Sequence, residues 1–116
     1  MLDLREHTEL IHQLVAEENA RDKNWTWSVE SITKNDIKIR WGYLDFLAEQ
    51  KNCCHLIAES DSESGDWLWA RTPKLNIIEC FMVAEKPNPR IGAEQTVQSG
   101  IRDAIREIAY YAHSRY

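Results

Sequence analysis

The chain has 116 residues and a formal net charge of −5, from 14 Lys and Arg against 19 Asp and Glu. This length suits one domain with its own core, so we expect residues 1–116 to form a single domain. With 43% hydrophobic and 28% charged residues, the composition is that of a globular protein and excludes a disordered chain. The acidic balance argues against nucleic-acid binding, which depends on neutralising phosphates with Lys and Arg.

Membrane insertion and secretion are not expected either. No apolar run approaches the 18 residues that indicate a membrane-spanning helix. Charged residues within the first seven positions occupy the place of a signal peptide's apolar segment. Cys53, Cys54 and Cys80 leave one cysteine unpaired in any disulfide scheme, which favours buried, reduced thiols. We therefore expect a cytoplasmic protein.

The first element expected is a helix over residues 4–22, where apolar residues recur at helical spacing. Asp3 is a plausible N-cap, and Glu6 three residues later completes an acidic version of the capping box. A helix of this length can cross one face of a sheet.

Three strands are expected next. Residues 25–30 and 37–43 alternate apolar and polar, with a turn at 34–36, and a third strand fits 53–59. The alternation changes phase after Gly42, which suggests a bulge or bend. Periodicity leaves open whether residues 44–50 are a strand or a helical turn.

Two more strands and a second helix complete the pattern. After a polar loop at 60–66, a short strand covers 67–70. Residues 75–84 are apolar at both parities, which favours a core strand that is central or covered on both faces. A second amphipathic helix spans about 97–112, and its Gly100 suggests close approach of the helix to the sheet. The predicted class is α+β, order α-β-β-β-β-β-α: a meander-like antiparallel sheet of about five strands with both terminal helices on one face.

Five tryptophans are the most informative feature of the sequence. Trp25 and Trp27 share one strand face, and so do Trp67 and Trp69. If both pairs faced inward, they would compete for core volume with apolar residues of the other strands and with the apolar stripes of the two helices. We expect two or three of them in the core and at least one pair partly exposed, where aromatic side chains favour binding.

Motifs for specific chemistry are weak or absent. Cys53 and His55 share a strand face, but the paired ligands of a structural zinc site are missing. The acidic segment 59–66 lacks the ligand spacing of an EF-hand, and the four glycines form no phosphate-binding loop. We predict no catalytic residue, no metal and no cofactor. A third hypothesis is a redox or metal protein built on Cys53, Cys54 and His55.

The leading hypothesis is a non-enzymatic protein that binds a protein partner, another copy of itself as a homodimer, or both, through a tryptophan-bearing sheet face or edge. In architecture and charge the chain resembles small acidic accessory proteins, such as secretion chaperones, immunity proteins and inhibitors of bacteria and phages. The alternative is a small-molecule-binding domain or enzyme that encloses an apolar or aromatic ligand in a tryptophan-lined cavity, with Glu30, Arg40, His55 and Glu79 as polar candidates. The predicted binding residues are Trp25, Trp27, Trp41, Trp67, Trp69, Arg40 and His55.

Overall fold

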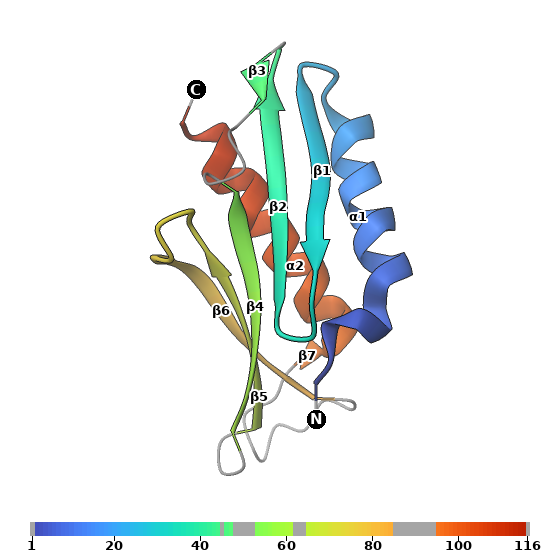
Figure 1. Cartoon of the computed structure of the whole chain (residues 1–116), viewed down its shortest axis with the longest axis vertical. Coiled ribbons are helices and arrows are strands. Elements are labelled where there is room, and N and C mark those ends of the chain that lie inside the picture. The colour runs from blue at the N-terminus through green and yellow to red at the C-terminus, as the bar shows by residue number, and fades with distance from the viewer. Residues whose placement is uncertain (1, 45, 48–52, 62–64, 85–94, 116) are drawn as a thin grey trace.

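All strands of the computed structural model lie between two helices in the chain (Figure 1). The structure describes residues 2–44, 46–47, 53–61, 65–84 and 95–115. In chain order, the elements are the 3-10 turn η1 (Leu4–His7), α1 (Thr8–Arg21), β1 (Trp25–Ile32), β2 (Asp36–Tyr43), β3 (Phe46–Leu47), β4 (Cys54–Asp61), β5 (Gly65–Arg71), β6 (Ile77–Ala84), β7 (Gln95–Thr96) and α2 (Val97–His113).

The strands form one sheet in the order β1-β2-β4-β5-β6-β7, and β3 pairs with the end of β2. Every pairing is antiparallel except that of β6 with β7, which is parallel. The α+β class and the five long strands confirm the prediction. The two-residue strand β7 has no counterpart in it, because two residues carry no periodicity, and β3 falls in the segment 44–50 that was left open between strand and helical turn.

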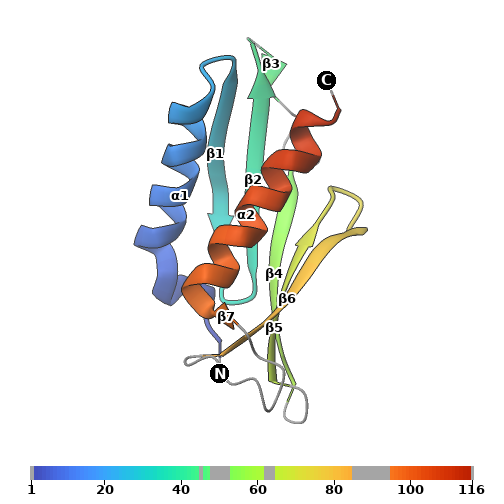
Figure 2. The ribbon, with the colours of Figure 1, turned by 180° about the vertical axis from the view of Figure 1, so that it is seen from behind.

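Both helices lie on one side of the sheet, as predicted. Figure 2 shows α2 crossing the strands, while α1 runs alongside β1 at the sheet edge. Neither helix, within the described residues, is long and apolar enough to cross a membrane. The core lies between the helices and the sheet, and its fully buried side chains include Leu4, Ile11, Ile37, Ile39, Leu56, Leu68, Ile101 and Ile108.

The first helical segment begins at the predicted cap, but as a 3-10 turn. Asp3 is the N-cap of η1, and its carboxylate accepts a hydrogen bond from the Arg5 backbone N–H at 3.0 Å. The Arg5 guanidinium also donates to this carboxylate, which lowers the pKa of Asp3 to about 2. The predicted helix over 4–22 is therefore split into η1 and α1, which begins at Thr8.

The change of phase after Gly42 is a chain reversal and not a bulge in β2. Gly42 pairs with Thr26 on one side and with Leu47 on the other. The backbone of Leu44 then adopts a left-handed conformation, with φ of 56°, which suits a tight turn. The irregularity between β1 and β2 lies instead in β1, between Val29 and Ser31. Of the undecided segment 44–50, Phe46 and Leu47 are strand, and residues 45 and 48–50 lie outside the described residues.

The expectation that residues 75–84 form a core strand that is central or covered on both faces is wrong. The segment forms β6, whose outer neighbour β7 pairs only with Val83 and Ala84. Of its eight residues only Val83 is fully buried, and Ile77 is 57% exposed. The central positions are held by β2, β4 and β5. The strand with apolar residues on both faces therefore lies next to the edge of the sheet, and not at its centre.

Candidate binding face

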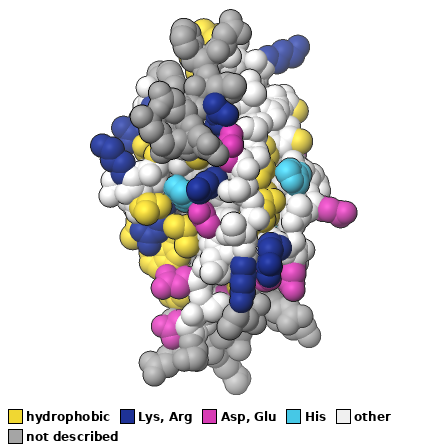
Figure 3. Space-filling view, viewed as in Figure 1, with side chains coloured by type: hydrophobic (Ala, Val, Ile, Leu, Met, Phe, Trp, Pro, Cys, Tyr) yellow, Lys and Arg dark blue, Asp and Glu magenta, His cyan; other side chains and the backbone are white. Residues whose placement is uncertain are grey.

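The sheet face opposite α2, here called the outer face, carries one of the two tryptophan pairs. Leu68 and Ala70 of β5 are fully buried on the helix side. Because side chains alternate along a strand, Trp67 and Trp69 point to the outer face, where both are partly exposed. Figure 3 shows hydrophobic side chains gathered over β5 and β6 on this face, beside a histidine and several charged groups.

The two indoles of this pair are stacked and held in place. Their ring centroids lie 5.9 Å apart with an interplanar angle of 28°. The Arg71 guanidinium lies over the Trp69 ring, 5.0 Å from its centroid, and its Nη1 donates to the Leu75 carbonyl oxygen at 2.9 Å. A cation over an indole is favourable, and the second contact fixes the guanidinium there. We call Trp67 and Trp69 the tryptophan plate.

The apolar surface continues from the plate towards the sheet edge. Met82 lies opposite Trp67 in β6, and Cys80 lies opposite Trp69. Beyond them, Ile77 pairs with Arg71 and is among the most exposed large apolar residues. Side chains on directly opposed strand positions contact one another, so the plate and these β6 residues form one surface.

A polar band lies on the other side of the plate, and it contains both predicted polar site residues. His55 Nδ1 lies 3.1 Å from Asp36 Oδ1, so this carboxylate orients the imidazole. The Arg40 Nη1 donates to Glu30 Oε1, also at 3.1 Å. The structure thus places His55 and Arg40 on the outer face, each beside a carboxylate. Of the other polar candidates, Glu79 lies on β6 and is exposed.

The structure does not bring the other three predicted tryptophans to this face. Trp25, Trp27 and Trp41 point to the helix side and are at most 6% exposed. The rings of Trp25 and Trp27 stack at 5.9 Å, and the His113 ring of α2 lies 4.3 Å from that of Trp25. These side chains serve as core, in line with the expected division of the five tryptophans.

The cysteines have the environment of structural thiols. Cys53 and Cys54 are buried, whereas Cys80 is partly exposed, and all three are free. Burial raises the pKa of both buried thiols, that of Cys54 to about 12, which keeps them protonated at neutral pH. Within the described part of the chain, no group of three or more His, Cys, Asp or Glu side chains is arranged to hold a metal ion.

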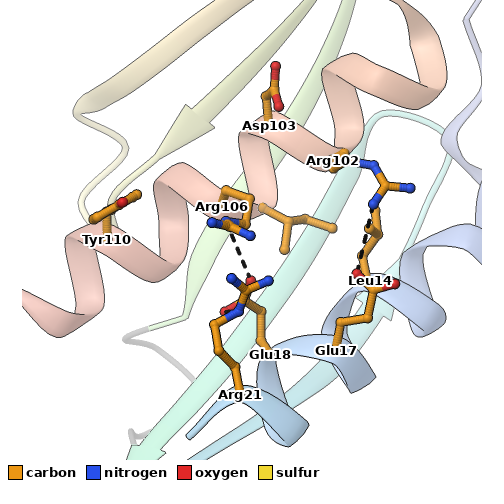
Figure 4. Close-up of a pocket in the computed structure, with 9 residues that line it drawn as sticks. Leu14, Glu17, Glu18, Arg21, Arg102, Asp103, Arg106 and Tyr110 are labelled. Carbon is orange, nitrogen blue, oxygen red and sulfur yellow. Dashed lines mark ion pairs between the residues drawn. The ribbon is translucent and has the colours of Figure 1, made fainter.

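A charged hollow of about 300 Å³ lies between α1 and α2 (Figure 4). Glu18 is 5% exposed there, with its carboxylate 3.7 Å from Arg21 and 4.0 Å from Arg106. A second pair joins Arg102 to Glu17 at 3.9 Å. With Asp103, the lining contains three acids and three arginines and no tryptophan. The opposed charges balance, and the ion pairs across this hollow connect the two helices.

Sequence reasoning missed both the interhelical contact and the neighbours of the plate. Arg102 and Arg106 are four residues apart and therefore share a helix face, which could have been predicted from the sequence. Their acidic partners on α1 could not be predicted, because these pairs depend on how the two helices pack against each other. The same holds for Met82 beside Trp67, since strand register cannot be read from one sequence.

Comparison of the chain with models of protein families, with curated proteins and with solved structures yields no match.

Proposed function

We propose that this chain is a non-enzymatic binding protein that contacts a protein partner through its outer sheet face. The observation that carries the proposal is the tryptophan plate, a stacked and partly exposed indole pair on the face that the helices leave uncovered. Tryptophan dominates binding hot spots because it buries a large area at little conformational cost. Core packing does not account for this pair, since Leu68 and Ala70 fill the helix side of the same strand.

The surroundings of the plate match the usual anatomy of a protein interface. Interfaces combine an apolar centre with a polar rim. Here the plate and Met82 supply the centre, and the His55–Asp36 and Arg40–Glu30 pairs supply a rim. The partner that fits is a protein surface that places an apolar side chain over the plate. The three free cysteines suit a reducing compartment, and we propose the cytoplasm.

The alternative of a tryptophan-lined ligand cavity receives less support. Trp25, Trp27 and Trp41 are packed in the core, and the hollow between the helices has no aromatic residue other than Tyr110 in its lining. A small apolar ligand that binds at the open plate would compete there with the protein partner.

The test compares partner capture by the wild-type chain and by the Trp67→Ser/Trp69→Ser variant. Loss of a hot-spot pair should weaken binding of the captured partner by at least about 30-fold, while circular dichroism shows an unchanged fold. Tyr110→Ser is the matched control, because Tyr110 is an aromatic residue, 66% exposed, on the helix side. Equal capture by the tryptophan variant and the wild type, or loss of the partner with the Tyr110 variant, would contradict the proposal.

A further inference from the structure

In the part of the chain that the structure describes, the edge of β6 is open over most of its length. One side of the strand pairs with β5, and on the other side β7 pairs with Val83 and Ala84. Among the described residues, none pairs with the outer edge of residues 77–82. This stretch contains no Pro or Lys, the residues that commonly protect sheet edges, and it is apolar apart from Glu79.

The opposite edge of the sheet is closed. The Asn19 side chain of α1 binds the backbone of β1 with both of its polar atoms: the Trp27 N–H donates to Oδ1 at 2.6 Å, and Nδ2 donates to the Trp27 carbonyl oxygen at 2.9 Å. Asn19 therefore occupies the outward backbone groups of Trp27, at which an added strand would have to pair. Among the described residues, the sheet thus offers one open edge, at β6, which favours a closed pair of chains over an open-ended chain of sheets.

The backbone of β6 determines which residues face the open edge. The Cys80 N–H donates to the Glu79 carboxylate at 3.0 Å and so points away from β5. Outward-pointing backbone groups recur at every second residue of an antiparallel strand, which adds Met82. The open stretch ends where β7 begins to pair, at Val83. Cys80 is therefore the centre of the available edge.

We infer that a second copy of this chain pairs with this edge, antiparallel to it, about a two-fold axis at Cys80. This register lets the two Cys80 residues exchange reciprocal backbone hydrogen bonds. It places Glu79 opposite Phe81 of the other copy, whereas a register centred on Glu79 would oppose two like charges. The edge is self-complementary in this register, which is what a two-fold interface requires. The inference concerns the sheet edge and does not depend on the function proposed for the outer face.

Glu79 limits the strength of this pairing. Its carboxylate already accepts the Cys80 N–H bond in the single chain, so an incoming strand must displace it. Because the edge is short and Glu79 competes for the Cys80 N–H, we expect a weak dimer whose population rises with protein concentration. Glu79→Ala removes the competitor from both copies and should tighten dimerisation about tenfold.

The register makes a chemical prediction at Cys80. Directly opposed residues that exchange hydrogen bonds have Cα atoms about 5.5 Å apart, within the range that a disulfide spans. Cys53 and Cys54 are buried, so Cys80 is the accessible thiol. Diamide, a two-electron oxidant, should therefore join two chains through Cys80: the two thiols lose two protons and two electrons, which reduce diamide to its hydrazine.

The experiment combines diamide treatment of the native chain, read on a non-reducing gel, with sedimentation at several concentrations. The wild type should form a cross-linked dimer, and Cys80→Ser should lose the cross-link but still dimerise. Met82→Pro should lose both, because it removes an outward N–H and leaves the bonds to β5 intact. Trp67→Ser/Trp69→Ser should dimerise as the wild type does, which separates this inference from the proposed function.

Two controls make the result decisive. Ser28→Cys in the Cys80→Ser background places an exposed thiol on β1, whose edge Asn19 closes, and it should not cross-link. Glu79→Ala should dimerise more tightly, which tests the edge without relying on the proline variant to fold. A wild type that sediments as a monomer at all concentrations would overturn the inference. So would cross-linking through residue 28, or an unchanged dimer in the Glu79 variant.

Discussion

At the scale of single residues, Gly100 explains how closely α2 approaches the sheet. A Cβ atom built at this position would overlap Val83 Cγ1 of β6 and lie 3.0 Å from Leu68 Cδ1 of β5. The absence of a side chain lets the helix backbone pack directly on the two strands. This contact was predictable from the sequence, because a glycine within an amphipathic helix costs stability unless packing requires it.

Gly100→Ala should therefore destabilise the protein, although alanine favours helix. The gain in helix propensity is about 1 kcal/mol, and overpacking against Val83 and Leu68 costs about 1–3 kcal/mol. We expect the free energy of unfolding to fall by about 1 kcal/mol, measured by urea denaturation. Gln98→Ala, at an exposed position of the same helix, should change it by less than about 0.5 kcal/mol. A more stable Gly100 variant would show that the helix can shift without cost.

The positions of the five tryptophans could be predicted from the sequence only in part. Counting bulky residues against core positions predicted that one pair lies outside the core. Which pair was not predictable, because Trp25/Trp27 and Trp67/Trp69 have the same spacing in alternating strands. Packing against α2 determines which pair is buried. His113 of α2 packs against Trp25, whereas Leu68 and Ala70 occupy the helix side of β5 and leave Trp67 and Trp69 on the other face.

At the scale of elements, the two edges of the sheet are treated differently. Asn19 of α1 binds the backbone of β1 at Trp27, whereas no described residue pairs with the β6 edge beyond β7. We predicted that β6 is buried because its apolar pattern is typical of a central strand. Strand order depends on contacts between distant segments, and these are absent from local periodicity.

Asn19→Asp should measure what the closure of the β1 edge contributes to stability. The substitution keeps the shape of the side chain but replaces the Nδ2 donor with an oxygen that faces the Trp27 carbonyl. One hydrogen bond is lost and two acceptors are opposed, so we expect the free energy of unfolding to fall by about 2 kcal/mol. Denaturant titration at neutral pH checks this value.

Gln13→Glu is the matched control for that substitution. It makes the same change from amide to acid on an exposed position of α1, where the amide bonds only Glu17 at 3.4 Å. The expected loss is less than about 0.5 kcal/mol, the size of a like-charge pair on a helix surface. Equal effects of the two substitutions would mean that charge, and not the bond to β1, determines stability.

At the scale of the whole molecule, the two sheet faces differ in what they carry. The helix side holds three tryptophans and the aliphatic core, and the outer face holds the tryptophan plate with its polar rim. The sequence was sufficient to predict that one face is covered by helices and the other is not. It was not sufficient to predict which polar residues join the plate, because His55 and Arg71 become neighbours only through the pairing of β4 with β5.

This division predicts the fluorescence of the molecule. Acrylamide should quench only the emission of the plate, since Trp25, Trp27 and Trp41 are at most 6% exposed. Trp67→Phe/Trp69→Phe should therefore abolish the quenchable component, whereas Trp27→Phe should leave it unchanged. Stern–Volmer plots of the three chains measure it. A quenchable component that survives in the plate variant would place the exposed indoles elsewhere.

The same measurement distinguishes the two ways in which copies of the chain can meet. Pairing through the β6 edge extends the sheet sideways and leaves the outer face of each copy open to solvent. Pairing through the plate would instead bury Trp67 and Trp69 between the copies. We therefore expect acrylamide quenching to stay constant across the concentration range in which sedimentation shows the dimer. Quenching that falls as the dimer forms would assign self-association to the outer face and leave the edge unpaired.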